Sequence, residues 1–448
     1  MTQTSPIVMS ILFTSHGAGR SAWLYPGAVD GASTSIAFHA EWAKKCEEAV
    51  FDLFFIADTP ASRTDNLEIW SKSPLFQNVF EPVTLLSSVA MQTSRIGLGA
   101  TVSTSFFEPF NIARQFASLD HISGGRACWN VVTSANDYAA RNFGHDKLPP
   151  HAERYAKARE CLDIVKSYWD TWEDDAFVYD KENARYFDPA KYHAVDHDGT
   201  YFKVFGGLNV ARAPQGHPII IQAGASEDGK NLAAETAEIV FGTGADIEKA
   251  KAFYADLKGR LARFGRDRKD LKILQGFAPV VAATEEEALA IAAEQDACVP
   301  IEVRVNALGM DLEVSLMHLP LDEPIPVEII PETSNHHKIY FDHIVEMIHK
   351  GGTLREIAME YNRSAKVLAG SPEQIADYIQ MWVEEEACDG FMLAPRSVPH
   401  DLQAFIDLVV PILQDRGLMR REYVGTTLRE HLGLPRPGNI HVAAEAAE

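Results

Sequence analysis

The stretch HISGGRACWNVVTSANDYAARNFG, residues 121–144, ends an apolar run in a cluster of small hydrogen-bonding side chains. Its Gly-Gly pair predicts a turn, and Ala127–Val132 is typical of a buried strand. Directly after this strand come Thr133, Ser134, Asn136 and Asp137. Hydroxyl, amide and carboxylate groups at the end of a strand can bind a ligand or position a reacting group, so this cluster is the first candidate site.

Three other predicted strands end in groups of the same kind. Asp58 follows the strand in FFIADTP, GLGATVSTS runs into Ser103 and Thr104, and a later strand leads into IIIQAGASEDG. A serine nucleophile needs a positioned base, and the chain has no GxSxG segment. Asp58 has no His or Glu companion at metal-ligand spacing and could equally be a turn cap. These strand ends disfavour both a hydrolase and a metal site.

Small neutral polar groups suit a large planar ligand with polar edges, such as an isoalloxazine ring that brings its own chemistry. In QAGASEDG, Gly224 allows close approach of the backbone, and Ser226 stands where a helix should begin. Its hydroxyl and the free N–H groups there can hold a phosphate, although Ser226 could also be only an N-cap. His151 and Tyr155 are four residues apart on one helix face and could meet the same anion, with ordinary packing as the alternative.

Eight short β-branched runs alternate with amphipathic segments, which predicts βα units and a parallel sheet. Eight units favour a (β/α)8 TIM barrel over a doubly wound sheet, and such a barrel has its active site at the carboxyl ends of the strands. The predicted strands are Ile7–Phe13, Leu53–Ala57, Ile96–Val102, Ala127–Val132, Pro218–Gln222, Ile239–Gly242, Ile273–Val281 and Gly390–Ala394. The predicted helices are Ile36–Ala49, Glu81–Thr93, Asn111–Leu119, His151–Trp169, Gly229–Thr236, Ile247–Phe264, Glu285–Glu294, Pro372–Glu386 and Leu402–Gln414.

Two stretches interrupt this alternation. Residues 173–213 predict a hairpin-like insertion, and residues 297–369, in which no parallel strand is recognisable, predict a lid or substrate wall. The tail, residues 416–448, is expected to be an exposed extension or a subunit contact. No segment indicates a second core, so residues 1–448 are interpreted as one barrel domain with these insertions.

The composition excludes several classes of protein. The formal net charge of −22 argues against nucleic acids and anionic membranes as partners. The five cysteines are scattered without a CxxC pair, which predicts buried thiols rather than disulfides or zinc ligands. No apolar stretch is long enough to span a membrane and no signal peptide is recognisable, so a cytoplasmic protein is expected.

Five segments spread over most of the chain carry a family resemblance: residues 51–58, 81–144, 151–176, 206–229 and 409–434. The chain resembles the bacterial-luciferase-like flavin monooxygenases, within them the nitrilotriacetate, EDTA and dibenzothiophene-sulfone monooxygenases. The resemblance implies reduced FMN and dioxygen as co-substrates, with a separate NAD(P)H-dependent flavin reductase as partner. It implies a flavin peroxide that oxygenates and cleaves a small organic or xenobiotic compound bearing sulfur, nitrogen or halogen. It also implies a homo-oligomer, a dimer or a tetramer.

The resemblance assigns residues to each part of the flavin but names no catalytic side chain. It places Asp58 and Ser103 or Thr104 beside the isoalloxazine ring, and Asn130 and Ser134 beside the ring and the ribityl chain. The phosphate is assigned to His151, Tyr155, Ser226 and the backbone at Glu227, next to Gly224.

The substrate pocket departs from the family pattern. The loop FTSHGAGRSAWLYP is short, with His16 as its only histidine, and the second insertion offers His318. The candidate pocket residues are Phe13, His16, Trp23, Phe106, Phe241 and His318, with core packing an equal alternative for the aromatic ones. Two other functions stay open: a deazaflavin-dependent oxidoreductase of the same superfamily, disfavoured by the ISGGR and NVVTS segments, and a non-catalytic flavin-binding protein.

Overall fold

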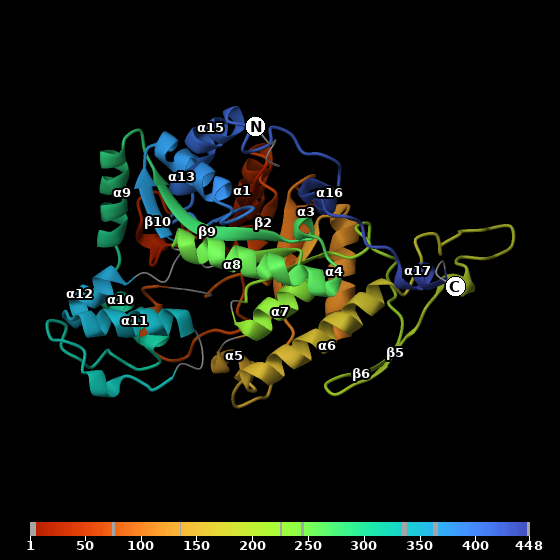
Figure 1. Cartoon of the computed structure of the whole chain (residues 1–448), viewed down its shortest axis with the longest axis horizontal. Coiled ribbons are helices and arrows are strands. Elements are labelled where there is room, and N and C mark those ends of the chain that lie inside the picture. The colour runs from red at the N-terminus through yellow and green to blue at the C-terminus, as the bar shows by residue number, and fades with distance from the viewer. Residues whose placement is uncertain are drawn as a thin grey trace.

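Eight parallel strands close into a barrel in the computed structural model, which describes residues 6–73, 77–134, 136–224, 226–242, 246–333, 338–361 and 366–445 (Figure 1). Each strand pairs in parallel with the next, and the last pairs with the first. The strands are β1 Val8–Leu12, β2 Leu53–Ile56, β3 Gly97–Ser103, β4 Ala127–Val132, β7 Ile219–Gln222, β8 Ile239–Gly242, β9 Lys272–Val281 and β11 Gly390–Leu393. The predicted (β/α)8 barrel is confirmed.

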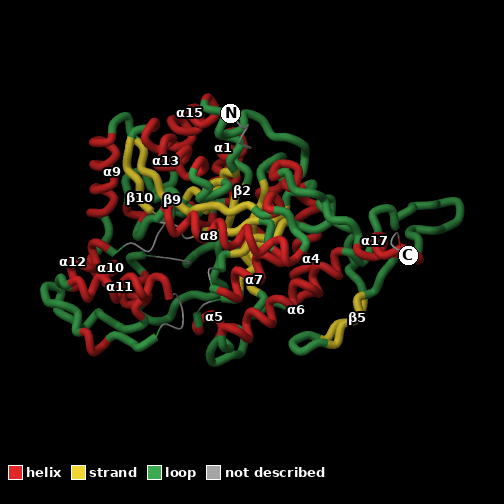
Figure 2. Tube along the Cα trace, viewed as in Figure 1, coloured by secondary structure: helices red, strands yellow, loops and turns green. Residues whose placement is uncertain are grey.

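Amphipathic helices cover the outside of the barrel (Figure 2). Several begin at a residue whose hydroxyl accepts a backbone N–H of the first turn, as Ser35, Thr284 and Ser371 do. The covering helices are α1 Ile36–Glu48, α3 Pro82–Ala90, α4 Pro109–Ser123, α6 His151–Trp169, α7 Glu227–Thr236, α8 Ile247–Arg260, α9 Glu285–Ala297 and α13 Pro372–Glu384. A last helical run joins α14 His400–Ala404, a π-helical turn Phe405–Val409 and α15 Val410–Asp415. No helix in the described ranges is long and apolar enough to cross a membrane.

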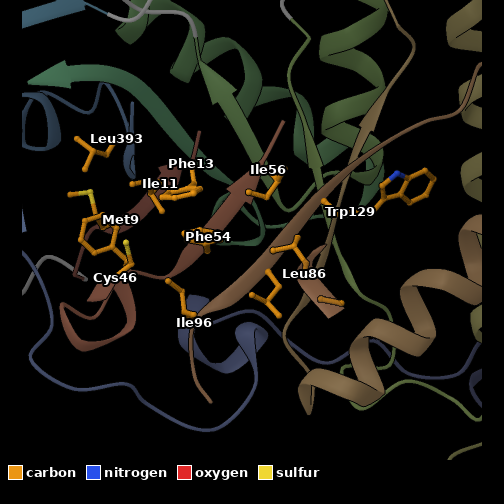
Figure 3. Packing of buried hydrophobic residues seen from close by; sticks show 14 of the residues in the cluster. Met9, Ile11, Phe13, Cys46, Phe54, Ile56, Leu86, Ile96, Trp129 and Leu393 are labelled. Atoms are coloured by element: carbon orange, nitrogen blue, oxygen red, sulfur yellow. The ribbon is translucent and has the colours of Figure 1, made fainter. Parts of the chain in front are cut away.

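The alternation of side chains along each strand separates two cores. Along β1, Val8 and Leu12 pack with residues of the other strands inside the barrel. Met9, Ile11 and Phe13 instead belong to the larger core between strands and helices (Figure 3). Phe13 packs there against Phe54, with ring centroids 4.6 Å apart, and not in the barrel interior. Of the two alternatives for Phe13, substrate lining and core packing, its position in this core favours core packing.

The C-terminal segment closes the amino end of the barrel. The short helix α16, Leu428–Leu432, places Leu428 and Leu432 in the interior core. It fits because β3 starts at Gly97, where a Cβ would lie 2.7 Å from Leu428 Cδ1. The expectation of an exposed tail is therefore wrong for this segment, since its leucines lie where side chains from the strands alone would leave a gap.

The first insertion contains an antiparallel hairpin, as predicted. Strands β5 Val195–Asp198 and β6 Lys203–Gly206 form it. The Glu160 carboxylate on α6 accepts hydrogen bonds from the backbone N–H groups of Tyr201 and Phe202, which fixes the hairpin to the barrel.

The second insertion folds into helices α10 Ile301–Leu312, α11 Lys338–Lys350 and α12 Leu354–Glu360, which share a hydrophobic cluster. Figure 1 shows these helices together on the side of the barrel where α5, Asp137–Asn142, also lies. Helix α10 is anchored to the loop after β2, because Lys72 pairs with Glu302 at 2.8 Å. The chain then forms β10, Lys366–Gly370, which pairs in parallel with β9. The expectation of no parallel strand in this region is wrong.

We expect the closure of the amino end to depend on Arg429, a 3 % exposed residue on α16. Its guanidinium donates to the His217 carbonyl at 2.9 Å and pairs with the Glu238 carboxylate. Arg429→Met would leave that half-buried carboxylate unpaired, so we expect a loss of about 3–5 kcal/mol in the free energy of unfolding. Urea unfolding followed by circular dichroism would measure it.

Arg421→Met is the matched control, because Arg421 pairs with Asp415 on the surface. Its loss should stay below about 1 kcal/mol. Equal losses for the two variants would contradict the anchoring role of Arg429.

Candidate functional site

The polar strand ends come together because they lie on four neighbouring strands. The order β2, β3, β4, β7 places the segments after these strands side by side at the carboxyl end of the barrel. Register pairs Ser103 with Val132, so Ser103 and Ser134 are neighbours, and their hydroxyl oxygens lie 2.8 Å apart. The candidate site is therefore a curved row of hydroxyl and amide groups along the carboxyl ends of these strands, which we call the arc.

Two asparagines contribute polar atoms without partners. The Asn130 amide donates to Thr101 Oγ1 at 3.0 Å, and the Thr101 hydroxyl donates to the Ile56 carbonyl at 3.0 Å. Asn130 Oδ1 is buried and accepts no hydrogen bond, and the same holds for Asn136 Oδ1. An unsatisfied buried oxygen costs free energy, which a ligand with N–H donors would recover.

Ser134 has a left-handed backbone with a φ of +57°, which is unfavourable for a residue with a side chain. Two contacts hold it there: the hydroxyl of Ser103, and Arg154 on α6, whose guanidinium donates to the Ser134 carbonyl. Thr104 has a different role from Ser103. Its hydroxyl donates to the Val132 carbonyl and is fully buried, so Ser103 is the one with its hydroxyl in the arc.

Sequence reasoning missed Arg154. It stands between His151 and Tyr155 on α6, where a charged residue ordinarily points to solvent, so no pattern in the sequence indicates an inward side chain. The structure buries it to 8 % exposure, and burial lowers the pKa of its guanidinium.

The start of α7 presents polar groups suited to an anion. Ser226 caps the helix by accepting the Gly229 N–H at 3.1 Å, while the other N–H groups of the first turn have no partner within the helix. The backbone of Gly224 approaches that of Gly229 so closely that a Cβ on Gly224 would lie 3.0 Å from the Gly229 Cα. The same Cβ would lie 3.1 Å from the Tyr155 hydroxyl, which therefore lies over this turn.

His151 and Glu227 complete this end of the arc. The His151 ring lies 4.6 Å from the Tyr155 ring, so both face the start of α7 as their spacing predicted. The Glu227 carboxylate turns away to Arg260, at 2.9 Å, and to Lys230. Only the backbone of Glu227 is therefore available to an anion at this helix start. Ala225, between these groups, lies outside the described residues.

Asp58 follows β2 at the other end of the arc. Burial and, to a smaller extent, the nearby Glu81 carboxylate raise the pKa of its carboxyl group to about 6, against a backbone hydrogen bond from Thr59 that lowers it. Asp58 therefore changes charge near neutral pH. This makes it the titratable group of the arc that can respond to a ligand.

The candidate pocket residues separate into two groups. Phe241 lies in the barrel interior, 5.0 Å from Phe55, and Phe106 stacks on Phe143 at 4.6 Å in the loops above the strands. The other three are more peripheral. Trp23 donates to the Lys72 carbonyl, the His16 imidazole bonds to the Val29 carbonyl, and His318 is exposed on the loop after α10.

A separate groove lies between α3 and α4, lined by Thr84, Ser87, Asn111 and Arg114 among others. Both helices cover the outside of the barrel, so this groove does not share the strand-end site. It contains none of the unpartnered groups described above.

The strand-end site fits a flavin nucleotide better than a metal ion. No group of three or more His, Cys, Asp or Glu side chains in the described ranges could hold a metal. The arc instead offers hydroxyls and amide oxygens from β2 to β4 and a helix start after β7, which match a ring with polar edges and a terminal phosphate. The residues that would hold the phosphate are His151, Tyr155, Ser226 and the backbone of Glu227.

Comparison with known proteins identifies the family. The luciferase-like monooxygenase model matches residues 14–389. The chain is 45 % identical to N-acetyl-S-(2-succino)cysteine monooxygenase of Bacillus subtilis, covering 97 % of this chain and 98 % of that protein. It is 42 % identical to nitrilotriacetate monooxygenase component A of Aminobacter aminovorans, covering 96 % and 97 %.

A solved structure agrees with these matches. Riboflavin lyase, crystallised with modified FMN and riboflavin, superposes with a TM-score of 0.86 at 29 % identity over 97 % of each chain. The resemblance found in the sequence segments is thus confirmed by whole-chain similarity. The chain belongs to the luciferase-like monooxygenase family and is a flavin-dependent monooxygenase.

Proposed function

We propose that the chain is the oxygenase component of a two-component system, which uses reduced FMN and dioxygen to oxygenate a small sulfur- or nitrogen-bearing organic acid. The observation that supports this most directly is the arc of polar groups that ends at the start of α7. The unpartnered Asn130 Oδ1 suits a ring N–H, and the turn at Gly224 and Ser226 suits a phosphate. When bound, FMN supplies the electrons and the dioxygen chemistry.

The protein's own residues would bind and orient rather than attack. Ser103, Asn130 and Ser134 would hold the ring and ribityl chain by hydrogen bonds, because all three project from neighbouring strands. Asp58 would lie at the ring and take up or release a proton at its carboxyl group near pH 6. The helices α10–α12 would exclude water from the reacting centre, since they are anchored to loops at this end.

The substrate class rests on the two relatives. The first relative is named for N-acetyl-S-(2-succino)cysteine, which bears sulfur. The second is named for nitrilotriacetate, which bears nitrogen, and both compounds are organic acids. The name "component A" of the second relative supports a separate flavin reductase as the partner that delivers reduced FMN. We also infer a homo-oligomer, dimer or tetramer.

The direct test supplies the purified chain with FMN, an NADH-dependent flavin reductase, NADH, oxygen and each of these two acids. Mass spectrometry with ¹⁸O₂ should find one labelled oxygen atom in the product. Turnover of either acid under strict anaerobiosis would overturn the proposal in favour of a dehydrogenase.

Removal of a single hydroxyl should show which residues bind the phosphate of FMN and which bind its ring. Tyr155→Phe removes a donor to a charged group, so we expect about tenfold weaker binding of FMN. Riboflavin, which lacks the phosphate, should bind as tightly as to the wild type. Quenching of flavin fluorescence measures both affinities.

Ser134→Ala should instead weaken the binding of FMN and of riboflavin by the same factor, because Ser134 is assigned to the ring and ribityl chain that both flavins share. Tyr168→Phe is the matched control, since Tyr168 lies on the same helix and packs against Phe110. Unchanged FMN affinity in both Tyr155→Phe and Ser134→Ala would refute these assignments.

Flavin binding should depend on the charge of Asp58. A ring placed over the carboxylate removes its remaining water, which raises its pKa above the value of about 6 in the free protein. The protonated form therefore binds flavin more tightly, and riboflavin affinity should fall as the pH rises through about 6. Titrations at several pH values would check this, with riboflavin because it has no titrating phosphate.

Asp58→Asn keeps the shape of the side chain but removes its charge. Its riboflavin affinity should be constant over the same pH range. A wild-type affinity that is equally constant would show that the carboxyl group lies away from the ring.

A further inference from the structure

The buried guanidinium of Arg154 has a hydrogen-bond donor that the fold leaves without a partner. One nitrogen, Nη1, donates to the carbonyls of Thr133, at 3.3 Å, and Ser134. Its Nε is buried without a hydrogen-bond partner. No carboxylate in the described ranges lies within ion-pair distance of it, and burial lowers the pKa of its guanidinium. The nearby Asp137 carboxylate raises this pKa but by less than burial lowers it, so Arg154 is a positive charge at the carboxyl end of the barrel without a directly paired carboxylate.

Other buried arginines show what a purely structural role looks like. Arg126 has five hydrogen bonds from its guanidinium, to carbonyls and one hydroxyl, and every nitrogen is used. Arg212 and Arg429 pair with Asp170 and Glu238. Arg154 has neither arrangement, so its charge and its free donor are available to a ligand.

The contact with Ser134 connects Arg154 to the flavin site. The carbonyl that Arg154 holds belongs to the residue in the left-handed conformation, and the hydroxyl of that residue meets Ser103 at 2.8 Å. An unfavourable backbone conformation persists only where its surroundings fix it. Without Arg154 the loop after β4 would relax, and the pair of hydroxyls would lose its alignment.

We propose that Arg154 is a positioning residue that aligns the Ser103–Ser134 hydroxyl pair and makes the site prefer reduced flavin to oxidised flavin. This inference rests on the proposed function. Two-electron reduction of FMN with uptake of one proton leaves the ring system with an added negative charge. A buried cation without a directly paired carboxylate stabilises the more negative form, because the low-dielectric surroundings screen its charge weakly.

The experiment compares the affinities of reduced and oxidised FMN for the full-length protein, the reduced form under anaerobic conditions. The preference is the ratio of these two affinities. In Arg154→Met we expect reduced FMN to bind at least about tenfold more weakly and oxidised FMN to lose less. A tenfold fall in the ratio corresponds to a shift of about 30 mV in the midpoint potential of bound FMN, to more negative values. Arg154→Lys keeps the charge and should retain most of the preference.

A double variant tests whether Arg154 acts through the hydroxyl pair. If it does, Arg154→Met combined with Ser134→Ala should lose less affinity for oxidised FMN than the sum of the two single losses. Arg159→Met is the control, because Arg159 lies on the same helix but pairs with Glu235 at the surface. That variant should leave both affinities and the ratio unchanged.

The outcomes separate the two proposals. A wild-type protein that binds neither form of FMN overturns the proposed function and this inference with it. A wild type that binds FMN, with Arg154→Met weakening both forms equally or adding fully to Ser134→Ala, overturns only the role of Arg154. If Arg154→Met does not fold, the lysine variant decides, since loss of the preference with the charge retained contradicts the proposal.

Discussion

Parallel pairing around a closed ring requires all eight carboxyl ends of the strands to emerge on one face. Neighbouring strands then bring together segments that are far apart in the chain, and Ser103, Ser134 and Ser226 become parts of one arc. The same constraint leaves the amino ends of the strands open on the opposite face. The chain fills that opening with its C-terminal leucines, against a β3 strand that begins with glycine. One end of the barrel is thus sealed with apolar side chains and the other remains polar.

Buried polar groups lie at both ends of the barrel, and even at the sealed end both ring nitrogens of His431 on α16 have no hydrogen-bond partner. At the sealed end, Arg429 uses its guanidinium on carbonyls and a carboxylate, and Asp120 accepts from Gln215 and the Ala127 N–H. At the open end, Asn130 Oδ1, Asn136 Oδ1 and Arg154 Nε have no partner. A native fold tolerates such a cluster where a ligand completes it, because the cost of each orphan is regained on binding. The orphan groups at the open end therefore support the proposed flavin site, together with their place at the carboxyl ends of the strands.

Periodicity in the sequence predicts the eight barrel strands to within about two residues, since buried β-branched runs between turns have few other solutions. It did not predict β10, which follows a long insertion, or the leucines of LREHL, which are too short a pattern to indicate burial. For Phe13 the sequence left substrate lining and core packing open, although strand parity places it with Met9 and Ile11 on the outer face. The sequence also does not indicate which way the Arg154 side chain points. It points inward to donate to the carbonyl of Ser134, a contact between residues in the left-handed turn and on α6 that no local pattern predicts.

The start of α7 combines free backbone N–H groups with acidic side chains. Its first turn carries Glu227 and Asp228, whose negative charges oppose a phosphate at the same helix start. Lys230 and Arg260 pair with Glu227, and in the described part of the chain Asp228 pairs with His151 at 3.6 Å. The attraction for a phosphate then comes from the backbone N–H groups, the Ser226 and Tyr155 hydroxyls and His151, while Arg154 donates to the loop after β4. Under the proposed function FMN is delivered in solution and leaves after each turnover, and a phosphate site opposed by two carboxylates suits such exchange.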